Sequence, residues 1–498
     1  MENQKNEQLK NKTIGGIFWS FGERILAQLV SFLVSIVLAR MLLPEEYGII
    51  ALVMVIISIC NVFVSSGFST SLVQKKDADE IDFSTVFYFG LVFSAILYAV
   101  VFFAAPLISS FYEYGQLTAV IRVMSITLII SSVKSVQHAK IKRDMKFKKF
   151  FWSTLSGTLI SAVVGIAMAY VGFGVWALVA QYLTNNVVDT LILTFTSNWK
   201  PKLKFSFSRL GGLLAFGWKV LLSSLLFTVY NDLRTLVIGA VYSTEDLAYY
   251  DKGKQFPRVV VVNIDSALSS TLLPVMSKMQ DSVSSVKNVI RRSIKTGSYI
   301  VMPMMMGLAM IAEPLVELLL TEKWLFCVPY LQMMCLAYAF LPLQTANVQA
   351  VLAVGKSGTS LKTEIIKRGA NILILLATFK ISVTAMVIGE VVATVVSYLV
   401  NTIVSKKMFG YGPLAQIIDL LPFIGISLAM GAVVYPMKYL PFPTIIVLIL
   451  QIVCGVAVYI ALSAIFKVES FRYVLNIIKP YLTKVFNKIK KLITPKNQ

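Results

Sequence analysis

The sequence places an arginine and several polar residues inside an apolar segment, at 14–38. Four of them follow the spacing i, i+4, i+7, i+11: Arg24, Gln28, Ser31 and Ser35. This spacing puts the side chains on one face of an α-helix. A polar face in a membrane lines a cavity or a helix–helix seam. For the serines, packing at a seam is a sufficient explanation, because small hydroxyl residues are common between membrane helices.

Arg24 changes that balance because of its depth. Counted from Ile14 at about 1.5 Å per residue, it lies about 15 Å along the helix, near the middle of an apolar layer about 30 Å thick. A guanidinium there costs about 2.5–3.5 kcal/mol or more unless it is solvated or paired. Glu23 is the neighbouring residue but points about 100° away around the helix. We therefore expect Arg24 to bind an anion, with an ion pair to another helix as the alternative.

A shift of 200 residues brings a second stretch into register with the first. The acidic turn at 43–48 falls over that at 243–248, and the shifted polar positions are occupied by Ser224, Thr228, Asn231 and Thr235. The two helices are the first and the seventh apolar segments, an even offset of six, so both begin on the same side of a membrane. This predicts parallel repeats related by an axis along the membrane normal.

Other ionisable residues also stand inside apolar segments. They are Arg122, Lys134, Asp189, Lys219, Asp232, Arg234, Asp265 and Glu390. Lys134 and Lys219 lie near the basic ends of their segments, where long side chains also reach water by snorkelling. The acidic residues are candidates for pairing with the arginines or for carrying a proton. His138 borders a basic loop, and we expect it to be solvated rather than a pH switch.

The composition identifies the class of protein that holds these residues. Of 498 residues, 57% are hydrophobic and 14% are charged, whereas soluble proteins carry about 25% charged residues. Too few polar residues are present to cover a soluble particle of this size. The chain is therefore predicted to be an all-α polytopic membrane protein, and a soluble enzyme, a secreted protein and a disordered chain are excluded.

Fourteen segments are long and apolar enough to span a membrane, which takes about 20 residues. They are 14–38, 47–69, 83–107, 117–137, 151–171, 174–196, 212–241, 256–276, 292–312, 326–354, 361–380, 382–404, 415–437 and 441–466.

The loops alternate in charge, which sets the orientation. Lys and Arg gather in every second loop, as in the cluster at 140–149, whereas the loops between are short and poor in basic residues. Cytoplasmic loops retain basic residues. Both termini are therefore predicted to be cytoplasmic. The net charge of +21 is then spread over one membrane face, which excludes a nucleic-acid partner.

Motifs for cofactor or metal chemistry are absent from the sequence. The four cysteines, Cys60, Cys327, Cys335 and Cys454, form no CxxC pair, so we expect no metal site and no disulfide framework. Gly355-Lys356-Ser357 resembles the end of a phosphate-binding loop, but Ala350 stands where that loop needs its first glycine. We expect no enzyme activity and no cofactor.

Several ordered motifs resemble one family. They are Trp19-Ser20 with Arg24, the run 38–48, Asp232 with Ile238-Gly239, the run 249–252, Leu273-Pro274, and Glu322-Lys323-Trp324 with Pro329 and Gln332. Their order and spacing resemble bacterial Wzx-like polysaccharide and oligosaccharide-lipid flippases of the multidrug/oligosaccharidyl-lipid/polysaccharide (MOP) exporter superfamily. The likeness covers about two-thirds of the chain, and fourteen spans agree with that family.

The resemblance implies a flippase that moves an undecaprenyl-diphosphate-linked oligosaccharide across the bacterial cytoplasmic membrane by alternating access, for cell-surface polysaccharide or lipopolysaccharide biosynthesis. Arginine forks match diphosphate oxygens, and a glycan needs hydrogen-bonding partners. The candidate substrate-binding residues are Arg24, Gln28, Ser31, Lys219, Asn231, Asp232, Arg234, Gln344 and Asn347. The candidate coupling residues are Glu23, Asp189, Asp265 and Glu390. The coupling ion, H⁺ or Na⁺, is left open.

Two other functions compete with this one. A cation-coupled multidrug exporter of the same superfamily would place acids in its cavity, and it would need only twelve spans. A membrane glycan polymerase or glycosyltransferase would need a large catalytic loop, which the short loops do not supply; we expect such enzymes as partners, besides membrane lipids.

These expectations give four domains. A six-helix bundle covers 1–208, a second covers 209–408, two further spans occupy 409–467, and a basic tail follows at 468–498. Apolar residues of the tail recur near helical spacing between lysines, which favours a helix on the anionic inner leaflet over a docking segment for a protein partner.

Overall fold

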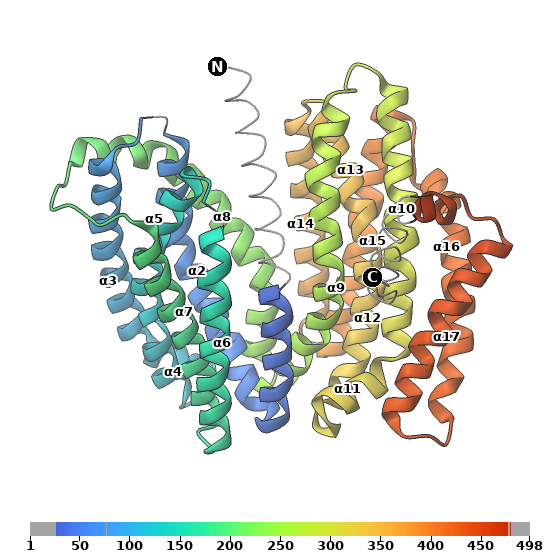
Figure 1. Cartoon of the computed structure of the whole chain (residues 1–498), viewed down its shortest axis with the longest axis horizontal. Helices are drawn as coiled ribbons and strands as arrows, with labels where there is room; N and C mark the ends of the chain where they lie inside the picture. Colours follow the sequence, from blue (N-terminus) through green and yellow to red (C-terminus); the bar gives the residue numbers. More distant parts are fainter. Residues whose placement is uncertain (1–25, 76, 147, 477–478, 480–498) are drawn as a thin grey trace, which may run out of the picture. The chain divides into compact units, whose positions relative to one another are not determined.

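A computed structural model describes residues 26–75, 77–146, 148–476 and 479. Every regular element in these ranges is a helix (Figure 1). Ten helices are long and apolar enough to cross a membrane, and α10 with α11, bent by 67°, makes an eleventh candidate. The chain is thus an all-helical polytopic membrane protein. The predicted number of fourteen spans is larger than this count, partly because the first segment begins outside the described residues.

The chain divides into two compact units, Met1–Asp251 and Lys252–Gln498. The first unit contains the helix Leu26–Met41 and the start of α9. Its other helices are α2 (Pro44–Gln74), α3 (Glu80–Phe111), α4 (Leu117–Met124), α5 (Ile126–Arg143), α6 (Lys148–Tyr170), α7 (Val175–Ser197) and α8 (Phe207–Val241).

The second unit holds most of α9 (Thr244–Ser277) and all the helices that follow. They are α10 (Val283–Met310), α11 (Ala312–Leu320), η1 (Glu322–Cys327), α12 (Val328–Ala339), α13 (Leu341–Ala353), α14 (Ser357–Thr378), α15 (Val383–Phe409), α16 (Pro413–Val434), η2 (Tyr435–Tyr439) and α17 (Thr444–Ile465). The predicted amphipathic tail, 468–498, is described only over 468–476 and at 479. Its helical start at 469–476 packs Phe471 and Val474 against the core of the second unit.

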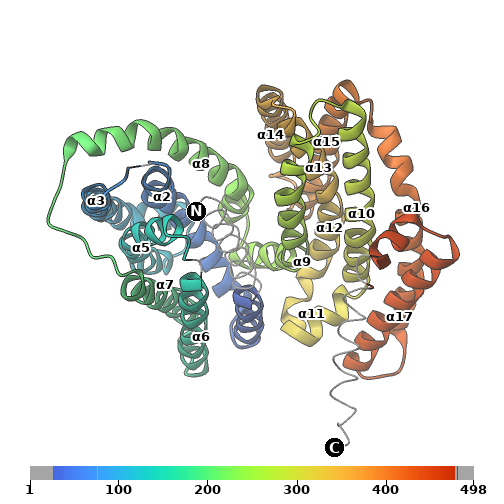
Figure 2. The same ribbon diagram turned by 45° about the horizontal axis from the view of Figure 1, so that its top comes forward.

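The unit boundary follows the packing of α8. The sequence-based division placed a boundary at 208/209, before this helix. In the structure α8 packs against α2 and α3 (Figure 2), and Leu210 and Leu213 join a buried cluster with Leu72 and Phe83. The compact units therefore separate after α8, at 251/252.

The internal repeat is visible in the helix ends. One helix ends at Met41 and α2 begins at Pro44; 200 residues later α8 ends at Val241 and α9 begins at Thr244. The acidic turns also share a hydrogen bond. Glu46 accepts from the Leu43 backbone N–H at 2.7 Å, and Asp246 accepts from the Ser243 N–H at 3.3 Å. These acids satisfy free N–H groups at a helix start, which explains why the turns are acidic.

The first repeat turn also packs closely against the second. A Cβ atom at Gly48 would overlap the backbone carbonyl of Thr244. Glycine lets two helices approach closely because it has no side chain at the contact. The first repeat has Gly48 at this position, whereas the shifted position is Ala248.

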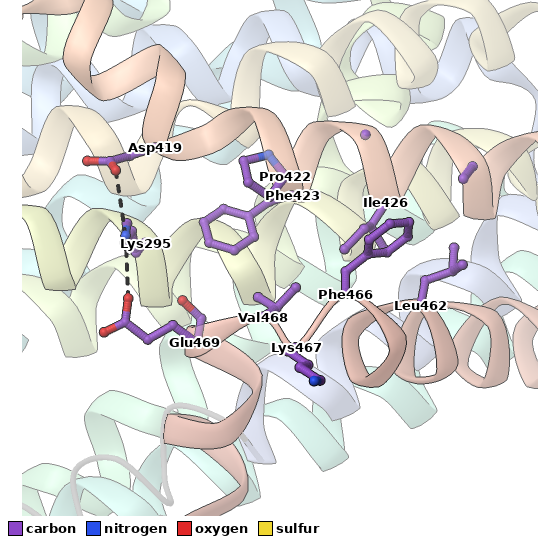
Figure 3. A pocket seen from close by; sticks show the side chains of 13 residues that line it. Lys295, Asp419, Pro422, Phe423, Ile426, Leu462, Phe466, Lys467, Val468 and Glu469 are labelled. Carbon is purple, nitrogen blue, oxygen red and sulfur yellow. Dashed lines mark hydrogen bonds and ion pairs between the residues drawn. The ribbon is translucent and has the colours of Figure 1, made fainter.

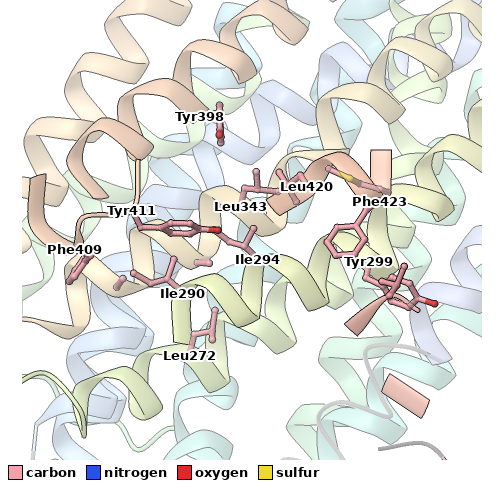
Figure 4. Close-up of a cluster of buried hydrophobic side chains, with 14 of the residues drawn as sticks. Leu272, Ile290, Ile294, Tyr299, Leu343, Tyr398, Phe409, Tyr411, Leu420 and Phe423 are labelled. Atoms are coloured by element: carbon pink, nitrogen blue, oxygen red, sulfur yellow. The ribbon is translucent and has the colours of Figure 1, made fainter. Parts of the chain in front are cut away.

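The core of the second unit lies among α9, α10, α13, α15 and α16. Ile290 and Ile294 of α10, Leu343 of α13 and Leu420 of α16 are 0–1% exposed and lie close together (Figure 4). Tyr299 of α10 extends this core toward α17, because it accepts a hydrogen bond from the Tyr459 hydroxyl on its backbone oxygen at 2.8 Å. Thus α16 and α17 are integral to the second unit.

Candidate functional site

The predicted polar stripe is only partly described. Glu23 and Arg24 lie outside the described residues. On the helix Leu26–Met41, Gln28 is half-buried and Ser31 is exposed. The depth and surroundings of Arg24 therefore remain a sequence prediction.

The matching helix α8 holds Asp232 against α2. The Asp232 carboxylate is half-buried and accepts a hydrogen bond from Ser58 Oγ at 2.8 Å. Arg234 is 7% exposed, whereas Asn231 and Lys219 are exposed. Of the four site residues predicted on α8, two therefore face protein and two face outward within this unit.

Another predicted acid of the first unit, Asp189, forms an ion pair with a lysine of the same unit. Asp189 of α7 is 5% exposed and pairs with Lys134 of α5. No other described residue donates a hydrogen bond to its second oxygen, Oδ1. Lys134 is thus a specific partner in this structure rather than only a snorkelling side chain. His138, one turn away, packs on Phe150 at 4.6 Å between ring centroids, and it is half-buried rather than fully solvated.

In the second unit, α9 and α13 share a polar ladder. Thr345 Oγ1 donates to Asp265. One turn further along both helices, Gln349 Nε2 donates to Ser269 Oγ at 3.1 Å. Gln344, a predicted glycan ligand, is half-buried beside this ladder in sequence. Asp265 therefore meets a neutral hydroxyl donor, not a lysine.

Glu390 of α15 differs from Asp265 in its partner. Lys254 Nζ of α9 lies 3.6 Å from its carboxylate, and both side chains are about one-fifth exposed. Lys254 lies just before the predicted segment 256–276, so sequence reasoning did not single it out. Its position in the sequence could have identified it, because a lysine within one or two turns of a segment's start can reach into the helix bundle.

Asn347 contacts another amide. It is 1% exposed, and its side chain exchanges two hydrogen bonds of 3.1 Å with Gln416 of α16. Gln416 also donates to the Tyr411 backbone oxygen at 3.1 Å. A buried amide pair of this kind satisfies its own polar atoms, so the structure gives Asn347 a role in joining α13 to α16.

The sequence analysis missed Asp419, which forms the centre of an ionic cluster. Arg291 donates to both of its carboxylate oxygens at 2.6 Å, and the Tyr411 hydroxyl donates at 2.8 Å. Burial raises the pKa of the Tyr411 hydroxyl, so it stays protonated and acts as the donor. Asp419 is the only charged residue in the sequence segment 415–437, and this could have identified it.

Beside Asp419 an apolar groove opens between α16 and the end of α17 (Figure 3). Its volume is about 720 Å³. Phe423, Ile426, Leu462 and Phe466 are among the side chains that line it. Lys295 lies at one end, 3.5 Å from Asp419 and 3.5 Å from Glu469.

A metal ion needs a set of ligand side chains that lie close together. In the described part of the chain, no three His, Cys, Asp or Glu residues come close enough together to hold a metal ion, and the four cysteines are free thiols. The polar side chains described above form ion pairs and hydrogen bonds with one another.

Comparison with known proteins identifies the family. A family profile described as "Polysaccharide biosynthesis protein" matches residues 37–329. The chain belongs to this family. A relative, the lipopolysaccharide biosynthesis protein WzxC of Escherichia coli (strain K12), is 21% identical over 439 residues, covering 85% of this chain and 89% of that protein.

Solved structures show the fold that this family member adopts. The lipid II flippase MurJ, in an inward closed conformation, matches with a TM-score of 0.72 at 17% identity, covering 90% of this chain and 98% of that one. An inward-facing multidrug resistance MATE family transporter of the MOP superfamily matches with a TM-score of 0.57 at 16% identity, covering 76% and 95%. These two likenesses show that the chain has the MOP fold. The predicted Wzx-like family and its transporter class are confirmed by the family match and the relatives.

Proposed function

We propose that this protein is the flippase that moves a lipid-linked polysaccharide precursor, an undecaprenyl-diphosphate-linked oligosaccharide, to the outer leaflet of the bacterial cytoplasmic membrane. The observation that carries this proposal is the family match over residues 37–329. It coincides with a flippase-like fold that extends over 90% of the chain. The same family match argues against the multidrug alternative, although the fold is common to both classes.

The proposal includes fourteen spans with both termini in the cytoplasm. Thirteen of the predicted segments overlap described helices over most of their length, and the helix Leu26–Met41 covers part of the first. The loops richest in Lys and Arg, such as 140–149, fall on the side assigned to the cytoplasm, and the alternation holds at nearly every loop. Two parallel six-helix repeats, followed by α16 and α17, would then rock to expose the substrate site to each leaflet in turn.

The charged headgroup requires cationic and polar ligands inside the bundle. A diphosphate is stabilised by guanidinium groups, for which Arg24 is our first candidate and Arg234 our second. Gln28, Ser31, Lys219, Asn231, Asp232 and Gln344 remain proposed contacts to the glycan or its phosphates. Asn347 stays on this list as a weaker candidate, because Gln416 already occupies its amide.

Among the four coupling candidates, the structure favours Asp265. Asp189 and Glu390 each have a lysine partner, so a counter-charge already lies beside each of these carboxylates. Among the described residues, Asp265 has the Thr345 hydroxyl and no ion-pair partner. A carboxylate in an apolar span without a cation is the group most easily neutralised by H⁺ or Na⁺. Glu23 lies outside the described residues.

The test is complementation in the native host after deletion of the gene. We expect loss of surface polysaccharide with accumulation of the lipid-linked precursor, restored by the wild-type chain. Arg24→Ala should abolish restoration at normal protein abundance. Arg24→Lys, which keeps the charge but not the planar fork, should restore it in part. Normal export by Arg24→Ala would refute the anion role of Arg24.

The same strains separate the competing functions. Increased sensitivity of the deletion strain to cationic dyes, with normal surface polysaccharide, would establish the multidrug exporter instead. Turnover of a sugar donor by the purified chain would establish a glycosyltransferase. Asp265→Asn should reduce export while Lys134→Ala with Asp189→Asn should retain it, because the pair is already neutral as a unit.

A further inference from the structure

The apolar groove does not end at its charged rim, because a second cavity continues beyond it. This basic pocket, of about 360 Å³, is lined by residues of α10 and of the chain after α17: Asn288, Arg291, Arg292, Lys295, Thr296, Glu469, Ser470 and Tyr473. The groove and the basic pocket share Lys295, Glu469 and Ser470. Together they form one amphipathic site within the second unit.

The two parts of this site differ in chemistry. Ring and aliphatic side chains of α16 and α17 line the groove, whereas guanidinium, ammonium, amide and hydroxyl groups line the basic pocket. A turn after α17 brings them together. Lys467 adopts a positive φ of 49°, and the chain then reverses so that Glu469 reaches Lys295 (Figure 3).

The charges of the site do not balance. Four cations line the two cavities, Arg291, Arg292, Lys295 and Lys467, against the two carboxylates of Asp419 and Glu469. Asp419 accepts two hydrogen bonds of 2.6 Å from Arg291 and also lies 3.5 Å from Lys295. Glu469 is 87% exposed and contacts Lys295 only at 3.5 Å. An anion can therefore replace Glu469 at Lys295 at little cost.

Arg292 supplies a second cation of the basic pocket, next to Lys295. Its guanidinium stacks 4.0 Å from the centroid of the Tyr473 ring. Stacking uses the face of the guanidinium and leaves the N–H donors at its edge directed outward. Such an edge is suited to bidentate binding of a phosphate.

We propose that this site binds an anionic glycerophospholipid of the inner leaflet, with an acyl chain in the apolar groove and the headgroup phosphate at Arg292 and Lys295. Basic pockets between helices on the cytoplasmic side suit anionic lipid headgroups. The inference rests on the proposed topology, which places the start of α10, the start of α16 and the end of α17 in the inner leaflet. It does not require that the protein export a glycan.

Native mass spectrometry of the detergent-solubilised full chain tests this binding, with phosphatidylglycerol as the probe and phosphatidylethanolamine as the zwitterionic comparison. We expect one phosphatidylglycerol to bind in preference to phosphatidylethanolamine. Arg292→Gln should weaken its binding about fivefold, the factor for losing one basic contact to an anionic lipid. Glu469→Gln should strengthen binding, because a competing anion is removed. Lys362→Gln on α14, an exposed lysine outside both cavities, is the matched control and should change nothing.

A second pair of variants tests the groove without touching a charge. A Cβ at Gly425, which lines the groove, meets no atom within 4 Å, so Gly425→Leu should fold normally and occupy space that the acyl chain needs. Displacing about two methylenes should weaken phosphatidylglycerol binding about tenfold. Gly369→Leu on α14 is the control, since Gly369 also has open space but lies outside the groove.

Three outcomes would overturn the assignment. Equal binding of the two phospholipids by the wild-type chain would refute the headgroup site, and unchanged binding by both Arg292→Gln and Gly425→Leu would refute its location. Stronger binding of undecaprenyl phosphate, weakened by the same two substitutions, would assign the site to the carrier lipid instead. A chain that binds phosphatidylglycerol as described but fails to restore export would refute only the proposed function.

Discussion

Each repeat binds the helix that follows it, α8 or α16, through an ionic cluster at the predicted cytoplasmic end. The two clusters differ in which side supplies the acids and which supplies the cations. In the first unit the acids belong to α3 and the cations come from the α7–α8 segment: Arg209 contacts Asp79 at 2.5 Å, and Lys202 contacts Glu80. In the second unit the cations belong to α10 and the acid comes from α16, where Asp419 binds Arg291.

The two clusters also differ in how far they are closed off from solvent. In the first, Asp82 is 0% exposed, both its oxygens contact Lys75 at 2.8 Å, and it accepts from the Asp79 N–H at 3.1 Å. Backbone contacts add to this attachment, because Ser84 and Thr85 of α3 accept hydrogen bonds from the N–H groups of Lys202 and Ser206. The second cluster borders an open groove and keeps an excess of cations. The same position in the repeat therefore serves as a structural clamp in one half and as a ligand site in the other.

The largest effect should come from Asp82→Ala. It removes a fully buried carboxylate and leaves Lys75 and the Asp79 N–H without their acceptor, which should lower the free energy of unfolding by about 3 kcal/mol. Denaturant unfolding in mixed micelles, followed by tryptophan fluorescence, measures it. Glu80→Ala is the control, because its pair with Lys202 is more than half exposed on both sides and should contribute less than about 1 kcal/mol. Equal losses for the two variants would contradict a closed clamp.

Asp419→Asn should have a smaller effect, about 2 kcal/mol, because the groove lets water reach the released cations. Arg291 is already 51% exposed. The same unfolding measurement applies, and phosphatidylglycerol binding should be retained or increased in this variant, since a carboxylate near the phosphate is lost. A larger loss of stability than in Asp82→Ala would reverse the comparison.

Substitutions at Asp79 distinguish the contribution of the helix cap from that of the ion pair in the first cluster. Its Oδ1 accepts from the N–H groups of Ile81 and Asp82 at 3.0 Å, so it caps α3, besides binding Arg209. Asp79→Ala should lose about 1 kcal/mol for the cap. Asp79→Asn keeps a good capping residue and should lose less. If the two variants unfold at the same denaturant concentration, the cap does not contribute.

The smallest effect is the pH dependence of that ion pair. The hydrogen bond from Arg209, helped by backbone N–H donors, lowers the pKa of Asp79 from 3.8 to about 2. A lowered pKa in the folded state stabilises the fold above the unfolded value, and this contribution disappears as the pH falls from 3.8 to about 2. The difference in melting temperature between wild type and Asp79→Asn should therefore shrink over that range. It should stay within the equivalent of about 1 kcal/mol, because the pair is exposed. A difference that grows on acidification would contradict the assignment.

Sequence reasoning was most effective where a one-dimensional pattern has a single physical cause. Apolar length predicted the helices, and the 200-residue shift predicted the repeated turn of Glu46 and Asp246, whose carboxylates cap their helices. Sequence reasoning was less effective at predicting which side chains form ion pairs with one another. Asp189 and Glu390 were recognised as intramembrane acids, but Lys134 and Lys254 as their partners follow only from how α5 packs on α7 and α9 on α15.

By itself the sequence determined the membrane class, the helical architecture, the repeat and the family-like motifs, because burial in lipid constrains composition residue by residue. Only the tertiary structure decided that Asn347 pairs with Gln416, that Asp265 lacks a basic partner among the described residues, and that a groove beside Asp419 joins a basic pocket. These features depend on side chains from helices far apart in the chain, and no local spacing specifies which of them meet.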